Sequence, residues 1–173
     1  MILRSWGPQT AFRMHAPRWA TAPTSGEGAA LHGGRANRRG VPALYLSLDS
    51  ATAVAEYQQL SRLMPPGTLV SYTVRLESVV DFSAGFDAAT WSPLWEDFGN
   101  DWRQLWFGER IEPPSWVLGD EVVAAGAQGL LFRSLVAPSG LNLVVYPDAL
   151  GPLDELTVYD PEGSLPTSQA SWR

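Results

Sequence analysis

Glycine and arginine gather near the start of the chain in a pattern that suits anion binding. Gly33 and Gly34 stand directly before Arg35 in a glycine-rich segment, residues 25–37. Glycine lets backbone N–H groups approach an anion closely, and arginine adds a rigid fork of donors that matches phosphate. Taken alone, this pattern is more typical of a glycine-containing turn with a surface arginine, so by itself it supports at most a generic anion-binding loop.

Three more polar residues stand at spacings that suggest a shared site. Tyr45 follows Arg35 by ten residues, and Glu56 follows Tyr45 by eleven. Ser134 comes directly after an apolar run that predicts a strand. Each also has an ordinary structural interpretation: strand packing for the tyrosine, a solvated helix position for the glutamate, and a strand-end cap for the serine.

Hydrophobic periodicity predicts the elements that must position these residues. Alternating or β-rich apolar runs predict strands at 43–48, 68–76, 79–82, 130–133, 141–146 and 156–159. Helical patterns predict helices at 52–63 and 116–125, begun by the caps Asp49-Ser50 and Ser115, and helical pieces over 87–107 broken at Pro93 and Gly99. Because helices alternate with strands that need not be parallel, the fold class is α/β (α+β), with a central mixed sheet flanked by helices.

The two ends of the chain show less periodicity. Residues 1–40 are rich in glycine, alanine, proline and arginine, and predict an ordered loop with short elements anchored by Trp6, Phe12 and Trp19. The polar tail from Pro161 is expected to fray. No repeat or domain boundary is apparent, so residues 1–173 are interpreted as one compact domain with its core at about 12–146.

Composition excludes several kinds of chemistry. The chain has no cysteine and only two histidines, His15 and His32, so we expect no metal site and a structural or surface role for both histidines. The first forty residues hold six arginines against one acid, whereas the rest holds six arginines against seventeen acids. This acidic body argues against direct nucleic-acid binding. No membrane span or secretory signal is apparent, so the cytoplasm is the expected location.

The ordered series of motifs resembles the RES domain family. The matching pieces are Gly-Gly-Arg-x-Asn, Leu-Tyr-Leu-Ser, Thr-Ala-x-x-Glu, Phe-Arg-Ser and Asn-Leu-Val, spread over about residues 12–146. The resemblance implies a compact fold similar to ADP-ribosyltransferase toxins and a role as the toxin of a bacterial toxin–antitoxin pair. It also implies NAD+ as substrate rather than cofactor, cleavage of the nicotinamide–ribose bond by water or phosphate, and an Xre-type helix-turn-helix antitoxin as partner.

Carried over residue by residue, the resemblance gives each candidate a role. Arg35, Tyr45, Glu56 and Ser134 match the functional positions; Gly33 and Gly34 belong to the nucleotide-binding loop, and Arg13 matches an earlier arginine of the family pattern. The chain departs from the family at Ala36, where an aromatic residue often stands, and this change is expected to loosen the loop.

The implied reaction suits these residue types. Nicotinamide leaves NAD+ without needing a general acid, because it is already cationic, and the ribose develops oxocarbenium character. A carboxylate such as Glu56 stabilises that charge or binds the ribose hydroxyls, as in glycoside hydrolysis. The arginines are expected on the diphosphate, Tyr45 stacked on nicotinamide or ribose, and Ser134 bonded to the ribose or carboxamide.

Two other functions fit the same residues. Transfer of ADP-ribose to a protein would use the same site, and a non-catalytic module would bind a nucleotide or other anion without turnover. The tryptophans at 91–106 are interpreted as core packing, with an antitoxin contact as the alternative. Assembly as a homo-oligomer or as a toxin–antitoxin hetero-oligomer stays open.

Overall fold

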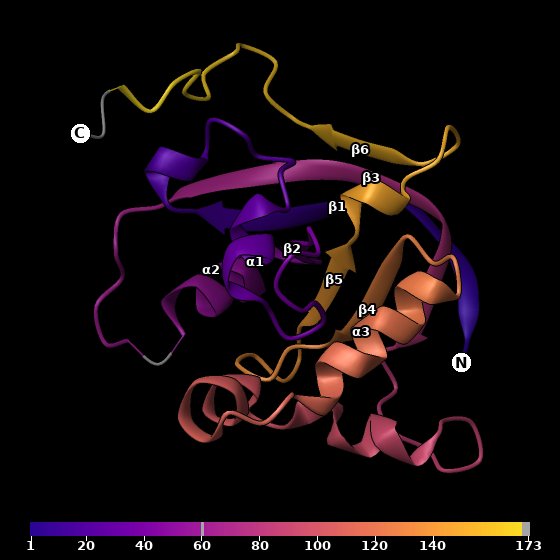
Figure 1. Cartoon of the computed structure of the whole chain (residues 1–173). Helices are drawn as coiled ribbons and strands as arrows, with labels where there is room; N and C mark the ends of the chain where they lie inside the picture. The colour runs from indigo at the N-terminus through magenta and orange to yellow at the C-terminus, as the bar shows by residue number, and fades with distance from the viewer. Residues whose placement is uncertain (60, 171–173) are drawn as a thin grey trace.

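The computed structural model describes residues 1–59 and 61–170, and in these a six-stranded sheet forms the centre of the molecule (Figure 1). The strands are β1 (Leu3–His15), β2 (Leu44–Ser47), β3 (Thr68–Phe82), β4 (Gly129–Arg133), β5 (Leu141–Val145) and β6 (Glu155–Val158). Among these described strands only the β3–β4 pair is parallel, and the other pairings are antiparallel. The prediction of an α+β fold with a mixed sheet is confirmed.

The sheet curls until it closes on itself. Its order is β1-β2-β5-β4-β3-β6, and β1 also pairs with β3. The ring closes narrowly at one point, where Phe12 of β1 pairs with Ser47 of β2. Ser47 also pairs with Asn142 of β5, so three strands meet at this place. Candidate residues on β1 and β2 are thereby brought close to the start of β5.

The two longest strands differ from the sequence prediction. Residues 3–15, expected to be part of a loop, form the strand β1, which pairs with β3 over ten positions between Leu3 and His15. Register shifts on either side of Trp6 disturb the inward–outward alternation that would have revealed this strand. The two strands expected at 68–76 and 79–82 are one continuous strand, β3.

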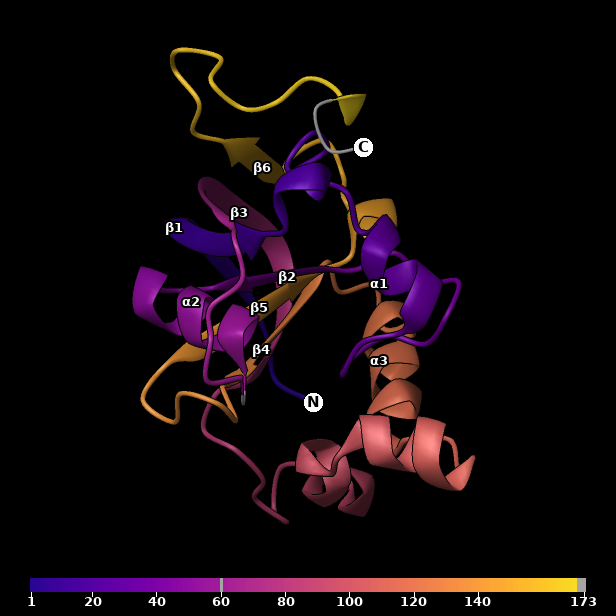
Figure 2. The ribbon, with the colours of Figure 1, turned by 90° about the vertical axis from the view of Figure 1, so that its left-hand side faces the viewer.

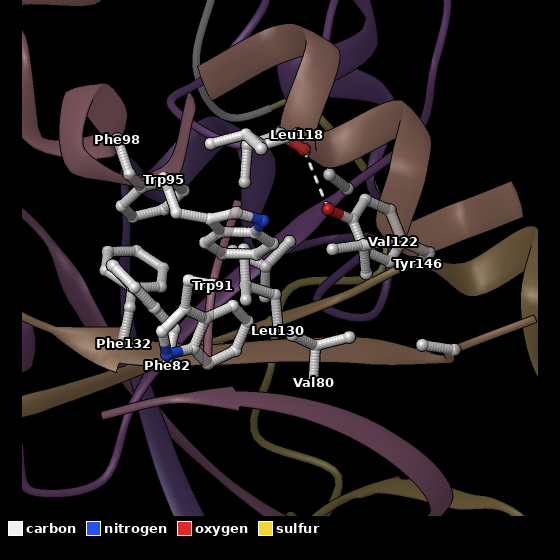
Figure 3. Packing of buried hydrophobic residues seen from close by; sticks show 14 residues of the cluster. Val80, Phe82, Trp91, Trp95, Phe98, Leu118, Val122, Leu130, Phe132 and Tyr146 are labelled. Carbon is white, nitrogen blue, oxygen red and sulfur yellow. Dashed lines mark hydrogen bonds between the residues drawn. The ribbon is translucent and has the colours of Figure 1, made fainter. Parts of the chain in front are cut away.

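Hydrophobic residues cover both faces of the sheet. Successive strand residues point to opposite faces, so Leu131 and Leu143 enter one cluster while Leu130 and Val144 enter the other. The second of these clusters lies beneath η2 (Pro93–Gly99) and α3 (Pro114–Ala124) and is dominated by rings (Figure 3). Its aromatic members are Phe82, Trp91, Trp95, Phe98, Phe132 and Tyr146. The interpretation of the tryptophans as core packing is confirmed for Trp91, Trp95 and Trp102, which are buried.

The helices follow their local signals only in part. Helix α2 (Ser50–Gln58) begins as predicted, because the side chain of Asp49 accepts a hydrogen bond from the backbone N–H of Thr52. It ends at Gln58 and not at residue 63. Helix α3 begins at Pro114 with Pro113 as its cap, so the prediction of Ser115 as cap is wrong. None of the described helices is long and apolar enough to cross a membrane.

The polar tail is not wholly separate from the domain. The backbone N–H groups of Ser164 and Leu165 donate to the carboxylate of Asp160, and Leu165 packs against the cluster that contains Leu131 and Leu143. Leu165 thus contacts the domain, whereas fraying of the rest of residues 161–170 stays a prediction.

A glycine inside α3 allows the helix to pack against the segment after α1 (Glu27–His32). A Cβ on Gly119 would overlap the backbone carbonyl of Ala36. We expect Gly119→Ala to lower the free energy of unfolding by about 1–3 kcal/mol, because backbone atoms must shift to relieve the overlap. Gly28→Ala is the matched control: Gly28 is also helical with open space around it, so alanine should stabilise by roughly 0.5–1 kcal/mol. Denaturant unfolding measures both changes, and equal stability of the two variants would contradict the role of Gly119.

Candidate functional site

A pocket of about 820 Å³ opens where β1, β2, β5 and α2 meet the loop after α1. This size is in the range of small-molecule sites, roughly 300–1,000 Å³. Figure 2 separates α2 from α1 and α3, with β2 and β5 between them. Six of the seven residues predicted from the sequence line the pocket: Arg13, Gly33, Gly34, Arg35, Tyr45 and Glu56.

The side chains of Asn37 and Tyr45 fix the loop 33–37 by hydrogen bonds. The buried amide of Asn37 donates from Nδ2 to the carbonyls of Ala29, Arg38 and Val41 at 2.9–3.1 Å. Tyr45 donates its hydroxyl to Asn37 Oδ1 at 2.7 Å and accepts the N–H of Ala36 at 2.8 Å. The loop is therefore pre-shaped before any ligand arrives.

The two glycines serve close packing and not anion binding by their backbone. The N–H of Gly33 donates to Ala29 O, and that of Gly34 donates to Asn37 O, so neither donor is free for a ligand. Gly33 has a φ of +79°, and a Cβ there would lie 2.6 Å from the ring of Trp116. The expectation that these N–H groups approach an anion is wrong, although both residues line the pocket.

Ala36 does not loosen the loop as expected. It is fully buried, and its carbonyl accepts the hydroxyl of Tyr146 at 2.7 Å, the contact dashed in Figure 3. A larger side chain at 36 is unnecessary here, since α3 approaches closely through Gly119. The departure from the family pattern is thus compensated by backbone contacts.

Arg13 brings a half-buried positive charge to the pocket, with no carboxylate partner in the described residues. Its Nη1 donates to the backbone carbonyl of Tyr45 at 2.7 Å, while its Nε is buried with no hydrogen-bond partner. Among the described residues, no ion pair reaches it. Burial lowers the pKa of Arg13, but arginine stays protonated in proteins. Such a charge favours an anionic ligand.

Arg35 joins the loop to the end of η2. Its Nη1 donates to the carbonyls of Phe98 and Asn100 at 3.0 and 2.9 Å. Burial lowers the pKa of Arg35, against the opposing influence of Tyr45 and Glu56. Backbone carbonyls fix the guanidinium but do not neutralise it, so a second positive charge faces the pocket.

Glu56 is the carboxylate that α2 presents to the pocket, and its Oε1 accepts two hydrogen bonds. Ser134 Oγ donates to it at 2.7 Å, and Asn142 Nδ2 donates at 2.5 Å. Ser134 does not line the pocket, and its hydroxyl also accepts the N–H groups of Val136 and Ala137. The expected hydrogen bond from Ser134 to substrate therefore conflicts with the bonds that this hydroxyl already makes.

Several pocket residues were missed from the sequence. Ser47 and Asn142 are buried polar residues on apolar strands, and such a residue in an alternating pattern is the signal that marks them. Arg103 and Phe107 also line the pocket, beside and within the π-helix η3 (Gln104–Glu109), and Arg103 lies over the ring of Trp102 at 4.7 Å. Irregular helices leave no clear periodicity, so no pattern predicted this wall.

His15 sits beside the site in a neutral form. Its Nε2 is 2.6 Å from the hydroxyl of Tyr72. Burial, assisted by Arg13, lowers the pKa of His15 from 6.5 to about 3. The expectation of a structural role agrees with this burial, since the ring does not line the pocket.

This burial predicts acid sensitivity of the fold. As pH falls below 6.5, the unfolded chain takes up a proton at this histidine before the folded chain does. The contribution of His15 to the free energy of unfolding should therefore fall as pH drops from 6.5 toward about 3, by at most about 1.4 kcal/mol per pH unit. Urea unfolding at several pH values should show a shallower dependence for His15→Gln and the wild-type dependence for His32→Gln, an exposed control. Identical slopes for wild type and His15→Gln would contradict the prediction.

The fold is an α+β domain with a curled mixed sheet, and arginines line its pocket. Residues 10–168 match the family model of the RES domain, and the chain therefore belongs to the RES domain family. Among curated proteins, none matches the chain significantly.

A solved structure supports the same fold. A chain of the M. tuberculosis MbcT–MbcA toxin–antitoxin complex superposes with a TM-score of 0.61. The alignment has 22% sequence identity and covers 91% of this chain and 84% of that chain.

Proposed function

We propose that this chain is the toxin of a toxin–antitoxin pair and that it cleaves the nicotinamide–ribose bond of NAD+ in the cytoplasm. One observation supports the proposal most directly: the pocket combines a half-buried arginine that forms no ion pair in the described residues, Arg13, with a hydrogen-bonded carboxylate, Glu56. NAD+ has the matching features, since its diphosphate is anionic and its ribose becomes cationic as nicotinamide departs.

The residues divide the work between binding and charge stabilisation. Arg13 and Arg35 bind the diphosphate, because guanidinium groups match phosphate oxygens in geometry and charge. Glu56 faces the ribose and stabilises the oxocarbenium-like transition state. The C–N bond electrons leave with nicotinamide, which becomes neutral. Water, which then gives up a proton to solvent, or an anionic phosphate oxygen bonds to the ribose carbon. The ring of Tyr45 lies beside the nicotinamide or its ribose, with its hydroxyl retained by the loop.

An antitoxin of the Xre type is the expected partner. The family resemblance supports this, as does the similar fold in the M. tuberculosis complex, which was crystallised with its antitoxin. Exposed apolar residues line the pocket, namely Phe107, Leu135 and Val136. Apolar side chains grouped at a pocket are typical of a surface that another protein covers.

A product assay on NAD+ tests the proposal. Purified protein is incubated with NAD+ in the presence and absence of phosphate, and nicotinamide and the ADP-ribose product are quantified by chromatography. Nicotinamide release is expected, with free ADP-ribose from hydrolysis or its phosphate ester from phosphorolysis. Expression in a bacterial host should deplete NAD+ and arrest growth.

The same assay separates the alternatives. NAD+ that carries a label in its adenylate half is used in a parallel reaction, and the proteins are separated on a gel. Label on a protein band would favour ADP-ribosyl transfer. Binding of NAD+ without nicotinamide release under any condition would overturn the proposed cleavage and favour a non-catalytic module.

A further inference from the structure

Glu56 ends a chain of hydrogen bonds that starts at a buried pair of side chains on β2 and β5. Ser47 Oγ donates to Asn142 Oδ1 at 2.8 Å, and Asn142 Nδ2 donates to Glu56 Oε1 at 2.5 Å. Ser47 and Asn142 are directly paired in the β2–β5 register, and each is less than a tenth exposed. The strands therefore fix the relative positions of both side chains.

The chemistry of the groups fixes the direction of these bonds. An ionised carboxylate can only accept hydrogen bonds, so the amide of Asn142 must turn its Nδ2 toward Glu56. Its Oδ1 then faces Ser47, whose hydroxyl has the proton that this oxygen requires. Ser47 thus holds Asn142 in the one orientation that supports a negative Glu56.

Ser134 completes the support from the other side. Its single hydroxyl proton goes to Glu56 Oε1, and the backbone N–H groups of Val136 and Ala137 donate to its oxygen. A hydroxyl has one donor and two acceptor positions, and all three are used. Ser134 has no hydrogen-bonding capacity left for a substrate.

We propose that Asn142 is a positioning residue, which together with Ser134 holds Glu56 by Oε1 and leaves Oε2 to act on the ribose. This inference rests on the proposed function. In the described part of the chain, Oε2 accepts no hydrogen bond, whereas Oε1 accepts two. The carboxylate is then fixed in direction without losing the oxygen that meets the substrate.

Kinetics of three variants test the role. Asn142→Leu keeps the side-chain size but removes a donor to a charged carboxylate, and should lower kcat for nicotinamide release about 10- to 100-fold while KM for NAD+ changes little. Ser134→Ala should act in the same direction. Ser115→Ala is the control, since Ser115 is a buried serine outside the pocket with no hydrogen-bond partner. A raised KM with unchanged kcat in Asn142→Leu would mean that Asn142 binds substrate directly, and would overturn the inference.

A pH profile separates positioning from simple packing. Asn142→Asp places a second carboxyl against Glu56, and repulsion between the two carboxylates raises the pKa at which the pair loses its second proton. Activity relative to wild type should be lowest near pH 8 and should recover toward pH 5, where the new carboxyl is protonated and donates to Glu56 Oε1. A ratio to wild type that does not vary with pH would overturn the inference.

Thermal unfolding examines the same contact without turnover. Asn142→Asp should lower Tm at pH 8, and this deficit should shrink at pH 5 and in the Glu56→Gln background. If wild type released no nicotinamide, the proposed function would fail, and these melting curves would still report on the support of Glu56. An Asn142→Asp protein that melts like wild type at pH 8 would overturn the inference whatever the activity on NAD+.

Discussion

Glu56→Gln is expected to lower kcat for nicotinamide release by about 10²–10³-fold, the range seen when one preorganised electrostatic group is removed from a transition state. The amide oxygen of glutamine can accept the same two hydrogen bonds, from Ser134 and Asn142, so the side chain should keep its place. What disappears is the negative charge that faces the developing oxocarbenium ion. Because that charge develops after NAD+ binds, KM should change less than kcat.

The control for this variant is a glutamate of another helix. Glu121 on α3 is exposed and does not line the pocket, so Glu121→Gln should leave kcat and KM unchanged. Nicotinamide is quantified over time for wild type and both variants, and circular dichroism confirms that each is folded. A folded Glu56→Gln protein with a wild-type rate would remove Glu56 from the proposed mechanism.

The parts of the fold that the sequence predicted well are those set by local chemistry. Alternating residues marked β2, and the Asp49 cap marked the start of α2, because both signals act within a few residues. The end of α2 lacked such a signal and was placed too late. The strand β3 was divided wrongly at Glu77 and Ser78, a polar pair within an apolar run.

Distant side chains explain why β3 does not break at this pair. The N–H of Glu77 donates to Asp154 Oδ1, and the N–H of Ser78 donates to Gln128 Oε1, both at 2.7 Å. These acceptors lie 77 and 50 residues further along the chain. No local pattern could indicate that the strand would be completed by such remote groups.

The candidate site shows the same limit. Motif spacing identified Arg35, Tyr45 and Glu56 as candidate site residues, and the structure places all three in one pocket. It did not indicate that Asn142 and Ser134 both bind Glu56, because that contact depends on how β2, β4 and β5 are paired. Residue types suggested what each group could do, whereas the register of the strands determined which groups meet.

Arg13→Met is expected to weaken NAD+ binding without weakening the fold. A hydrogen bond to a charged group contributes about 1.5–3 kcal/mol, so its loss should raise KM roughly 10- to 100-fold. Methionine fills a similar space and removes a half-buried charge that has no ion-pair partner in the described residues. Removal of such a charge should leave the free energy of unfolding unchanged or higher, despite the lost hydrogen bond to Tyr45 O.

Arg13→Met is expected to raise KM for NAD+ without lowering the free energy of unfolding, so measuring both quantities separates a role in binding from a role in folding. Steady-state kinetics gives KM, and thermal unfolding with pyrophosphate as the probe reports anion binding, since a ligand that binds only the folded state raises Tm. Pyrophosphate should raise Tm of wild type and of the control Arg75→Met, whose arginine is exposed on β3, but not of Arg13→Met. If Arg13→Met lost stability and kept its response to pyrophosphate, Arg13 would support the fold and not the ligand. The diphosphate site would then have to be sought at Arg35 and Arg103, the other arginines that line the pocket.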